Sequence, residues 1–293
     1  MSEVLCLPKN VQETPRPRLG QINYINSLPI SLPIDRGIVG IEAEVHYGTP
    51  QELNRGYAAN SLDLGVMSAF FYLQSSGLKI FADLSISSSG PVGSVLFFSK
   101  AELRQGKSLK IAVSSASATS VNLLSILLKE EYKIEASFNY CPMPDLTARD
   151  IDGALVIGDY ALNVDASWSK ISRRVDLGEW WSSRFNLPMV FAVWAARADW
   201  QNLHGAECDR LANSLNESLA AGLGTAFDQV VAEAAKRSRL STSRLERYFR
   251  AELDFSFSSA HLAGLNRYKS LCEKHGLFGQ GLPDRLLQGV PLG

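Results

Sequence analysis

Short apolar runs alternate with helix-like segments along the first third of the chain. Residues 19–25, 62–66 and 78–84 are short and rich in aliphatic side chains, which predicts strands. Residues 41–45 alternate between apolar and acidic side chains, as a strand with one exposed face does. Helical segments separate these runs, so the order β-α-β-α-β is predicted for this part of the chain.

Two helix starts in this region are marked by their capping residues. The sequence NSLP at 26–29 provides a cap followed by proline in the first turn, where its missing N–H costs no hydrogen bond. Thr49 and Glu52 have the spacing of a capping box, with Pro50 at the first helical position. We therefore predict helices directly after Ser27 and from Pro50.

The same alternation continues beyond residue 99 and then gives way to helices. Further strands are predicted over residues 109–113, 134–140, 154–157, 174–177 and 188–195. Helices are predicted around 121–128, from 158, over 179–184 and, in the last third, over 211–223, 226–235, 241–249 and 259–275. No strand is predicted after residue 199.

Alternating strands and helices predict an α/β fold with parallel sheets, and 293 residues are enough for two hydrophobic cores. We expect two lobes joined by two strand-like crossings, at 92–99 and 188–196. The expected division is a leader at 1–17, a first lobe of 18–97 plus 197–293, and a second lobe of 98–196. The C-terminal helices are expected to pack on the first lobe or to form a dimer contact, so a monomer and a homodimer both remain open.

A serine- and glycine-rich stretch, SISSSGPVGS at 85–94, leads directly into the apolar run at 95–98. In open α/β sheets the ligand lies beyond the carboxyl ends of the strands, where such a stretch forms a loop. Gly90 and Gly93 would let backbone N–H groups approach a ligand, and the serines, Ser89 among them, could donate hydroxyl hydrogen bonds. The apolar run would then be a buried crossing strand.

Other polar residues also follow predicted strands and precede helices. The segment SSASATS at 114–120 can present free N–H groups and hydroxyls to an anion such as a carboxylate, or can simply cap a helix. Asp159 and Asn26 have the same two interpretations, ligand binding or helix capping.

Composition and charge limit the possible partners. With 46% hydrophobic and 20% charged residues and a formal net charge of −1, the chain has no electrostatic reason to bind nucleic acid or an anionic membrane, so a small-molecule ligand is expected. There is no apolar stretch near 18 residues and no signal-peptide core, which predicts a cytoplasmic protein. The four cysteines lack C-x-x-C spacing and the four histidines are isolated, so neither a metal nor a disulfide framework is predicted. Walker and dinucleotide glycine motifs are absent as well.

Several segments together resemble the chorismate dehydratase family of the futalosine route to menaquinone. The resemblance runs in order over residues 18–257 and rests on the following sequences: RLGQINYINSLPI, TPQELNRGYAANSLDLGVMS, DLSISSSGPVGSVLFFS, VSSASATSVNLL, ALVIGDYAL, LGEWWSSRFNLPMVFAVWAAR and, more weakly, LDFSF.

This resemblance implies a fold, a reaction and a set of site residues. The fold would be the two-lobed, type II periplasmic-binding-protein-like fold with two hinge crossings, and the reaction would convert chorismate to 3-enolpyruvylbenzoate and water without a cofactor. The family's important asparagine and serine would be Asn26 and Ser94. Substrate contacts are expected from Ser68, Ser89, Gly90, Gly93, Ser117, Ala118, Thr119, Ser120 and Asp159.

Because the chain has no histidine between His46 and His204, we hypothesise that the enolpyruvyl carboxylate of the substrate accepts the C3 proton. Asn26 and Ser94 would orient that carboxylate and assist the departing hydroxyl. Two alternatives remain: a cytoplasmic binding or sensor protein for an aromatic or dicarboxylic acid, and a sister enzyme that releases a dihydroxynaphthoate with a cleft histidine. The histidine-free central region disfavours the sister enzyme.

Overall fold

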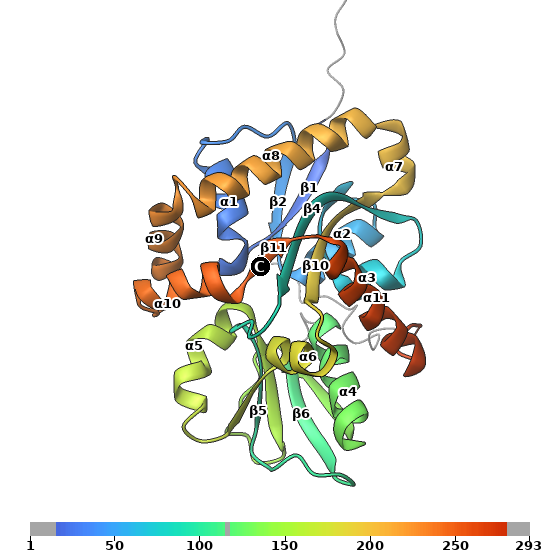
Figure 1. The fold of residues 1–293 in the computed structure, drawn as a ribbon, viewed down its shortest axis with the longest axis vertical. Coiled ribbons are helices and arrows are strands. Elements are labelled where there is room, and N and C mark those ends of the chain that lie inside the picture. Colours follow the sequence, from blue (N-terminus) through green and yellow to red (C-terminus); the bar gives the residue numbers. More distant parts are fainter. Residues whose placement is uncertain (1–15, 115–117, 280–293) are drawn as a thin grey trace, which may run out of the picture.

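A computed structural model describes residues 16–114 and 118–279 of the chain, which form two lobes stacked along the long axis (Figure 1). A six-stranded sheet with strand order β11-β4-β10-β3-β1-β2 forms the first lobe and a five-stranded sheet with order β7-β6-β8-β5-β9 forms the second. The strands of the first sheet are β1 (Arg18–Ile22), β2 (Glu44–Gly48), β3 (Leu64–Ser68), β4 (Leu78–Ser88), β10 (Met189–Arg197) and β11 (Asp254–Ser256). Those of the second are β5 (Val95–Ser99), β6 (Ser108–Ser114), β7 (Glu135–Cys141), β8 (Gly153–Ile157) and β9 (Arg173–Asp176).

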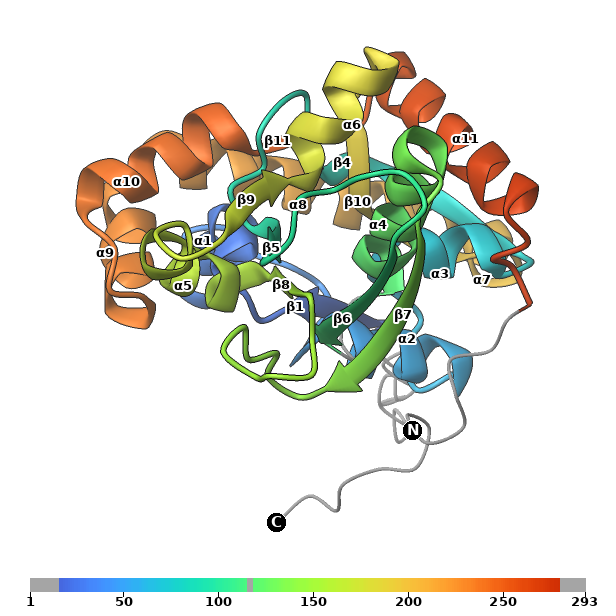
Figure 2. The same cartoon turned by 90° about the horizontal axis from the view of Figure 1, so that it is seen from below.

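Helices cover both sheets, and the C-terminal helices lie mainly around the first lobe (Figures 1 and 2). Those that follow strands of the first lobe are α1 (Leu28–Asp35), α2 (Pro50–Ala58) and α3 (Ala69–Gln74). The second lobe holds α4 (Ala118–Tyr132), α5 (Gly158–Trp168) and α6 (Leu177–Phe185). The remainder are α7 (Ala198–Leu203), α8 (Gly205–Leu223), α9 (Phe227–Arg237), α10 (Thr242–Arg247) and α11 (Ser259–Lys274), with a 3-10 turn η1 (Ile25–Ser27) and a π-helical turn η2 (Tyr248–Glu252).

The capping predictions for α2 are confirmed. The Thr49 side chain accepts the backbone N–H of Glu52, the Glu52 carboxylate accepts the N–H of Thr49, and Pro50 begins the helix. For α1 the predicted start at Leu28 and the proline in the first turn are confirmed, but the predicted side-chain cap is not formed, because the Ser27 hydroxyl donates to the carbonyls of Ile22 and Tyr24 instead. Local sequence therefore determines where these two helices begin.

The prediction of parallel sheets is only partly right. Strand β1 pairs in parallel with β2 and β3, and β6 pairs in parallel with β7 and β8. However, β10 runs antiparallel to β3 and β4, and β5 runs antiparallel to β8 and β9. Strand β4 carries the chain out of the first sheet and β10 brings it back, so these neighbours must point in opposite directions.

The connections between the sheets are shorter than predicted. We call residues 89–94, between β4 and β5, the first crossing segment, and residues 186–188, between α6 and β10, the second crossing segment. Strand β10 pairs within the first sheet, although the predicted division gave residues up to 196 to the second lobe. Strand β5 pairs within the second sheet, although the predicted first lobe extended to residue 97. The predicted lobe boundaries otherwise stay a prediction.

The serines before residue 89 do not form a loop, contrary to the prediction. Strand β4 continues through them to Ser88, and Ser85, Ser87 and Ser88 are fully buried. The Ser85 hydroxyl donates to the carbonyl of Ser256 in β11, which pairs antiparallel with β4. The sequence did not predict β11 as a strand, because three residues are too few to show a period.

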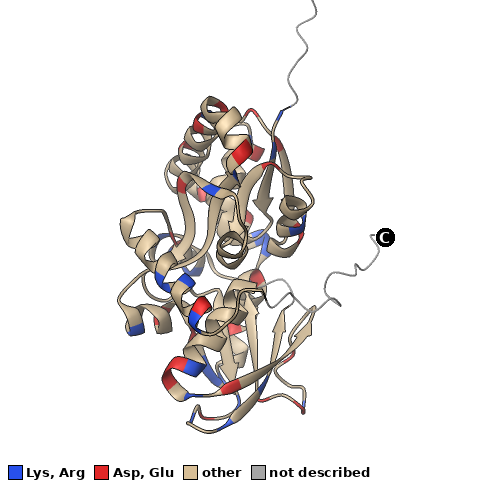
Figure 3. Cartoon of the chain, turned by 90° about the vertical axis from the view of Figure 1, so that its right-hand side faces the viewer, with Lys and Arg blue, Asp and Glu red and all other residues tan. Residues whose placement is uncertain are grey.

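Charges are intermingled over the surface. Basic and acidic residues alternate over both lobes rather than gathering by sign (Figure 3). Within the described residues, no helix is both long and apolar enough to cross a bilayer.

Candidate functional site

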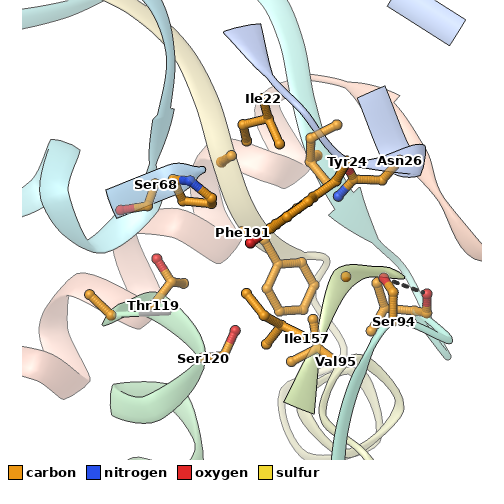
Figure 4. Close-up of a pocket in the computed structure, with 16 residues that line it drawn as sticks. Ile22, Tyr24, Asn26, Ser68, Ser94, Val95, Thr119, Ser120, Ile157 and Phe191 are labelled. Carbon is orange, nitrogen blue, oxygen red and sulfur yellow. Dashed lines mark hydrogen bonds between the residues drawn. The ribbon is translucent and has the colours of Figure 1, made fainter. Parts of the chain in front are cut away.

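A pocket lies between the lobes, with about 590 Å³ of empty space including its open side (Figure 4). The lining residues come from both lobes and are Ile22, Tyr24, Asn26, Pro50, Ser68, Ile86, Val92, Ser94, Val95, Ala118, Thr119, Ser120, Ile157, Gly158, Phe191 and Ala192. Among these described residues none carries a formal charge at neutral pH, so the pocket offers neutral donors and apolar walls.

Asn26 and Ser94 lie on the same side of this pocket (Figure 4). Asn26 belongs to η1, and its Oδ1 is buried without a hydrogen-bond partner within the described part of the chain. A buried polar atom without a partner is uncommon in a folded protein, so this atom is a candidate for contact with a ligand. The Ser94 carbonyl accepts the N–H of Gly158 at 2.8 Å, and its hydroxyl donates to the Val92 carbonyl over a long distance of 3.4 Å.

Ser68 and Thr119 lie on the opposite side, one from each lobe (Figure 4). The Ser68 hydroxyl oxygen accepts from Asn54 Nδ2 at 3.0 Å and caps α3 through the N–H of Phe71. The Thr119 hydroxyl oxygen accepts the N–H of Phe70 at 3.1 Å. Because both oxygens already accept hydrogen bonds, both hydroxyl protons remain available for donation to an anion.

Asp159 caps a helix, but that helix belongs to the other lobe. Its Oδ1 accepts the backbone N–H of Ile25 in η1 at 2.9 Å. Burial raises the pKa of Asp159, and the opposing effects of the Ile25 N–H and the positive charge of Arg237 only partly offset that rise. The predicted substrate contact at Asp159 stays a prediction, while the capping interpretation is wrong for α5, the helix that Asp159 opens, because α5 has no side-chain cap.

The structure brings together only part of the predicted site. Asn26, Ser68, Ser94, Ala118, Thr119 and Ser120 line the pocket. Ser89 and Gly90 instead line a second cavity, formed with α8, η2 and β11, and Gly93 is directed by its N–H to Asp176. The continuation of β4 through Ser88 explains this difference, because only six residues remain to form the loop. Ser117 lies outside the described residues.

Tyr24 is a pocket residue that the sequence did not single out. Its ring crosses the pocket (Figure 4) and packs on Gly158 of the second lobe, where an added Cβ would lie 3.1 Å from the Tyr24 ring. Gly158 also has a φ of +57°, a conformation that favours glycine. Both this conformation and the nearby Tyr24 ring therefore disfavour a larger residue at position 158. Burial, followed by the negative charge of Asp159, raises the pKa of Tyr24 to about 12, so the phenol stays protonated. Its position two residues before Asn26, in the same strand-to-helix turn, is the signal that could have revealed it.

No metal site is formed by the part of the chain that the structure describes. In residues 16–114 and 118–279, no three histidine, cysteine, aspartate or glutamate side chains gather where they could hold an ion.

Similar solved structures define the class of fold. A protein from Archaeoglobus fulgidus superposes with a TM-score of 0.70 at 21% identity, covering 89% of this chain and 97% of that one. The alkanesulfonate-binding protein of Xanthomonas axonopodis pv. citri gives a TM-score of 0.63 at 15% identity, covering 92% and 96%. A Candida albicans protein described as having the generic periplasmic binding protein fold gives 0.64 at 10% identity, covering 94% of both chains. The chain therefore has the two-lobed, periplasmic-binding-protein-like α/β fold that the resemblance implied.

Sequence comparison then identifies the family. A family model described as menaquinone biosynthesis matches residues 17–274. The chorismate dehydratase of Thermus thermophilus is 31% identical over 217 residues, which cover 66% of this chain and 73% of that protein. The chain belongs to this menaquinone biosynthesis family, which confirms the resemblance found in the sequence.

Proposed function

We propose that the protein is a chorismate dehydratase, which removes water from chorismate to give 3-enolpyruvylbenzoate in the interlobe pocket without a cofactor. The similarity to the Thermus thermophilus enzyme supports the substrate. The observation that carries the proposal is the pocket itself, in which uncharged donors from both lobes surround apolar walls. Such a lining suits a small dicarboxylate with a ring.

The two carboxylates of chorismate need separate sets of donors. Ser68 and Thr119 offer two hydroxyl protons on one side of the pocket, near the first turn of α4. The N-terminus of a helix favours an anion because its N–H groups are unpaired and its dipole is positive there. Asn26 and Ser94 offer an amide and a hydroxyl on the other side (Figure 4). Phe191, Ile157 and Val95 supply apolar contact for the ring between them.

The reaction begins with loss of the C3 proton, whose bonding electrons move into the ring system toward the ring carboxylate. Neutral donors fixed at that carboxylate stabilise the developing charge. The C4–O bond then breaks, the hydroxyl leaves with a proton as water, and the ring becomes aromatic. The transferred proton balances the reaction, since the proton taken from C3 is returned to the leaving oxygen.

The proton acceptor is the enolpyruvyl carboxylate of the substrate. Tyr24 is the one titratable side chain among the described lining residues, and its pKa near 12 keeps it protonated and unable to act as the base. The Asp159 carboxylate is already bonded to the Ile25 N–H. Asn26 and Ser94 would orient the enolpyruvyl group so that its carboxylate reaches C3, and would donate to the departing hydroxyl.

A direct test is incubation of the purified protein with chorismate, without metal or nucleotide, followed by mass analysis. Formation of a product lighter by one water, with the ultraviolet absorbance of an enolpyruvylbenzoate, is expected. Intact chorismate after prolonged incubation would instead favour a binding protein, a use that the likeness to the alkanesulfonate-binding protein makes the second candidate.

A further inference from the structure

The first crossing segment, residues 89–94, ends at Ser94 and is fastened by a buried carboxylate. Asp176 closes β9, and its side chain is fully excluded from solvent. One oxygen accepts the N–H of Val92 at 3.0 Å, and the other accepts the N–H of Gly93 at 2.8 Å. These are the two amides directly before Ser94.

The same carboxylate also caps α6. It accepts the N–H groups of Gly178 at 3.0 Å and Glu179 at 3.2 Å, which makes four N–H donors to one side chain. Three of these N–H groups point to one oxygen and the fourth to the other oxygen, which also lies 3.7 Å from Arg174 Nη2, so this buried charge is surrounded by donors. Helix α6 leads into the second crossing segment. The Asp176 side chain therefore links the two crossing segments between the lobes.

The fit between α6 and the first crossing segment is close. A Cβ on Gly178 would lie 2.4 Å from Ser88 Oγ and 2.7 Å from the Gly90 carbonyl oxygen, so only glycine permits this approach. On the opposite side, the ion pair between Arg244 and Glu252 lies against Gly93. The segment is therefore held from both sides immediately before Ser94.

We infer that Asp176 is a positioning residue: its carboxylate fixes the first crossing segment and thereby the hydroxyl of Ser94 at the pocket. This role rests on the proposed function, in which Ser94 acts on the substrate. Asp176 does not line the pocket itself. Its effect on the reaction is transmitted through the two amides before Ser94.

Two substitutions separate this role from helix capping. Asparagine and serine cap helices about as well as aspartate, so Asp176→Asn and Asp176→Ser retain the cap of α6. Neither replacement can present two acceptor oxygens to Val92 and Gly93. Asp152→Asn is the matched control, because Asp152 also accepts a backbone N–H, that of Lys110 at 2.8 Å, but lies directly before β8 rather than at the crossing segment.

Kinetics give the first readout. A displacement of about 1 Å at a reacting group can cost about 100-fold, so the Asp176 variants should lower kcat by about 10- to 100-fold with KM changed less than about threefold. In a Ser94→Ala background the further loss should be less than about twofold, because both changes act through one group. The control should stay within about twofold of the parent. Equal losses in both backgrounds would overturn the inference.

Amide hydrogen exchange gives a second readout that does not depend on turnover. The amides of Val92 and Gly93 should exchange slowly in the parent protein and the control, and faster in both Asp176 variants. Rapid exchange already in the parent would overturn the inference even if no variant folds, as would unchanged exchange in the variants. Chorismate left intact by the parent, together with faster exchange in the variants, would overturn the proposed function and support the anchoring by Asp176.

Discussion

The carboxylate of Asp159 in α5 accepts the backbone N–H of Ile25 in η1, with 2.9 Å between oxygen and nitrogen, so one hydrogen bond joins the two lobes beside the pocket. It lies next to Gly158, against which the Tyr24 ring packs. The contact therefore connects the turn that carries Asn26 with the segment that holds Ser94 through the Gly158 N–H.

Asp159→Asn should change the pH dependence of stability. Because burial raises the native pKa of Asp159, the native state keeps this proton to higher pH than the unfolded chain does. Burial of Asp159 therefore does not reduce the free energy of unfolding below the unfolded pKa, where the side chain is protonated in both states. It reduces the free energy of unfolding as the pH rises through the native pKa. The free energy of unfolding of the variant, relative to the parent, should increase between about pH 3 and pH 7. Chemical unfolding at several pH values measures it, and a constant or declining difference would contradict the raised pKa.

The same variant tests the identity of the base. If the substrate carboxylate accepts the C3 proton, Asp159→Asn should reduce kcat less than the roughly 100-fold or more that loss of a general base can cause. The amide oxygen can still accept the Ile25 N–H, so the interlobe contact remains. A larger loss of kcat in a variant that remains folded would make Asp159 the base.

Ser94→Ala should reduce kcat by about 100-fold or more, in the range found when one preorganised donor is removed from an oxyanion site. Ser99→Ala is the matched control, because Ser99 is also buried in this region but donates to the Ala101 carbonyl at the far end of β5. Initial rates of product formation at saturating chorismate compare the two. Similar rates for both variants would remove Ser94 from the proposed chemistry.

Helix α11 is attached to the second lobe through Glu130 of α4. The Glu130 carboxylate lies 2.7 Å from Lys274 Nζ and 2.8 Å from His275 Nε2. The hydrogen bond from Lys274, followed by that from His275, lowers the pKa of Glu130 despite an opposing effect of burial.

Glu130→Gln should therefore destabilise the protein at neutral pH by about 0.5 kcal/mol, the scale of a solvent-screened ion pair. Because the native pKa of Glu130 is lowered, its contribution is present above the unfolded pKa and disappears as the pH falls through the native pKa. Urea unfolding at pH 7 and near pH 3 measures both regimes. If the free energies of unfolding of parent and variant differ as much near pH 3 as at pH 7, the ion pairs of Glu130 are not the cause of the difference.

Much of the fold could be predicted because local signals determine it. The capping box at Thr49 and Glu52 and the proline after Ser27 fix two helix starts without help from tertiary structure. Strand direction could not be predicted in this way, since the pairing of β10 with β4 depends on where the chain returns from the second sheet. The burial of Ser85 and Ser87 was missed for a related reason: their hydroxyls pair with each other and with β11, a partner about 170 residues away.

The candidate site was predictable where function follows a strand-to-helix turn. Asn26 and Thr119 occupy such positions, Ser94 ends the glycine-rich connection between β4 and β5, and the structure gathers all three at one pocket. Tyr24 and Asp176 were not predicted, because a pocket wall and a loop anchor become visible only when distant segments meet. The bond between Asp176 and Gly93 joins residues 83 positions apart, and no local pattern encodes it.

The strand order of the first sheet also sets the order in which the chain can be completed during synthesis. The second sheet is built from the continuous stretch 95–176 and can form once that stretch has emerged. The first sheet must wait for β10 near residue 190 and for β11 near residue 255, although it begins at residue 18. Strands β1, β2 and β3 can pair with one another before that, but β4 lacks its partners until β10 and β11 have emerged, and contacts of such long sequence separation form slowly. A nascent chain thus has a finished second lobe and an unfinished first one, and the pocket is complete only once β10 has emerged, because β10 supplies Phe191 and Ala192 to its lining.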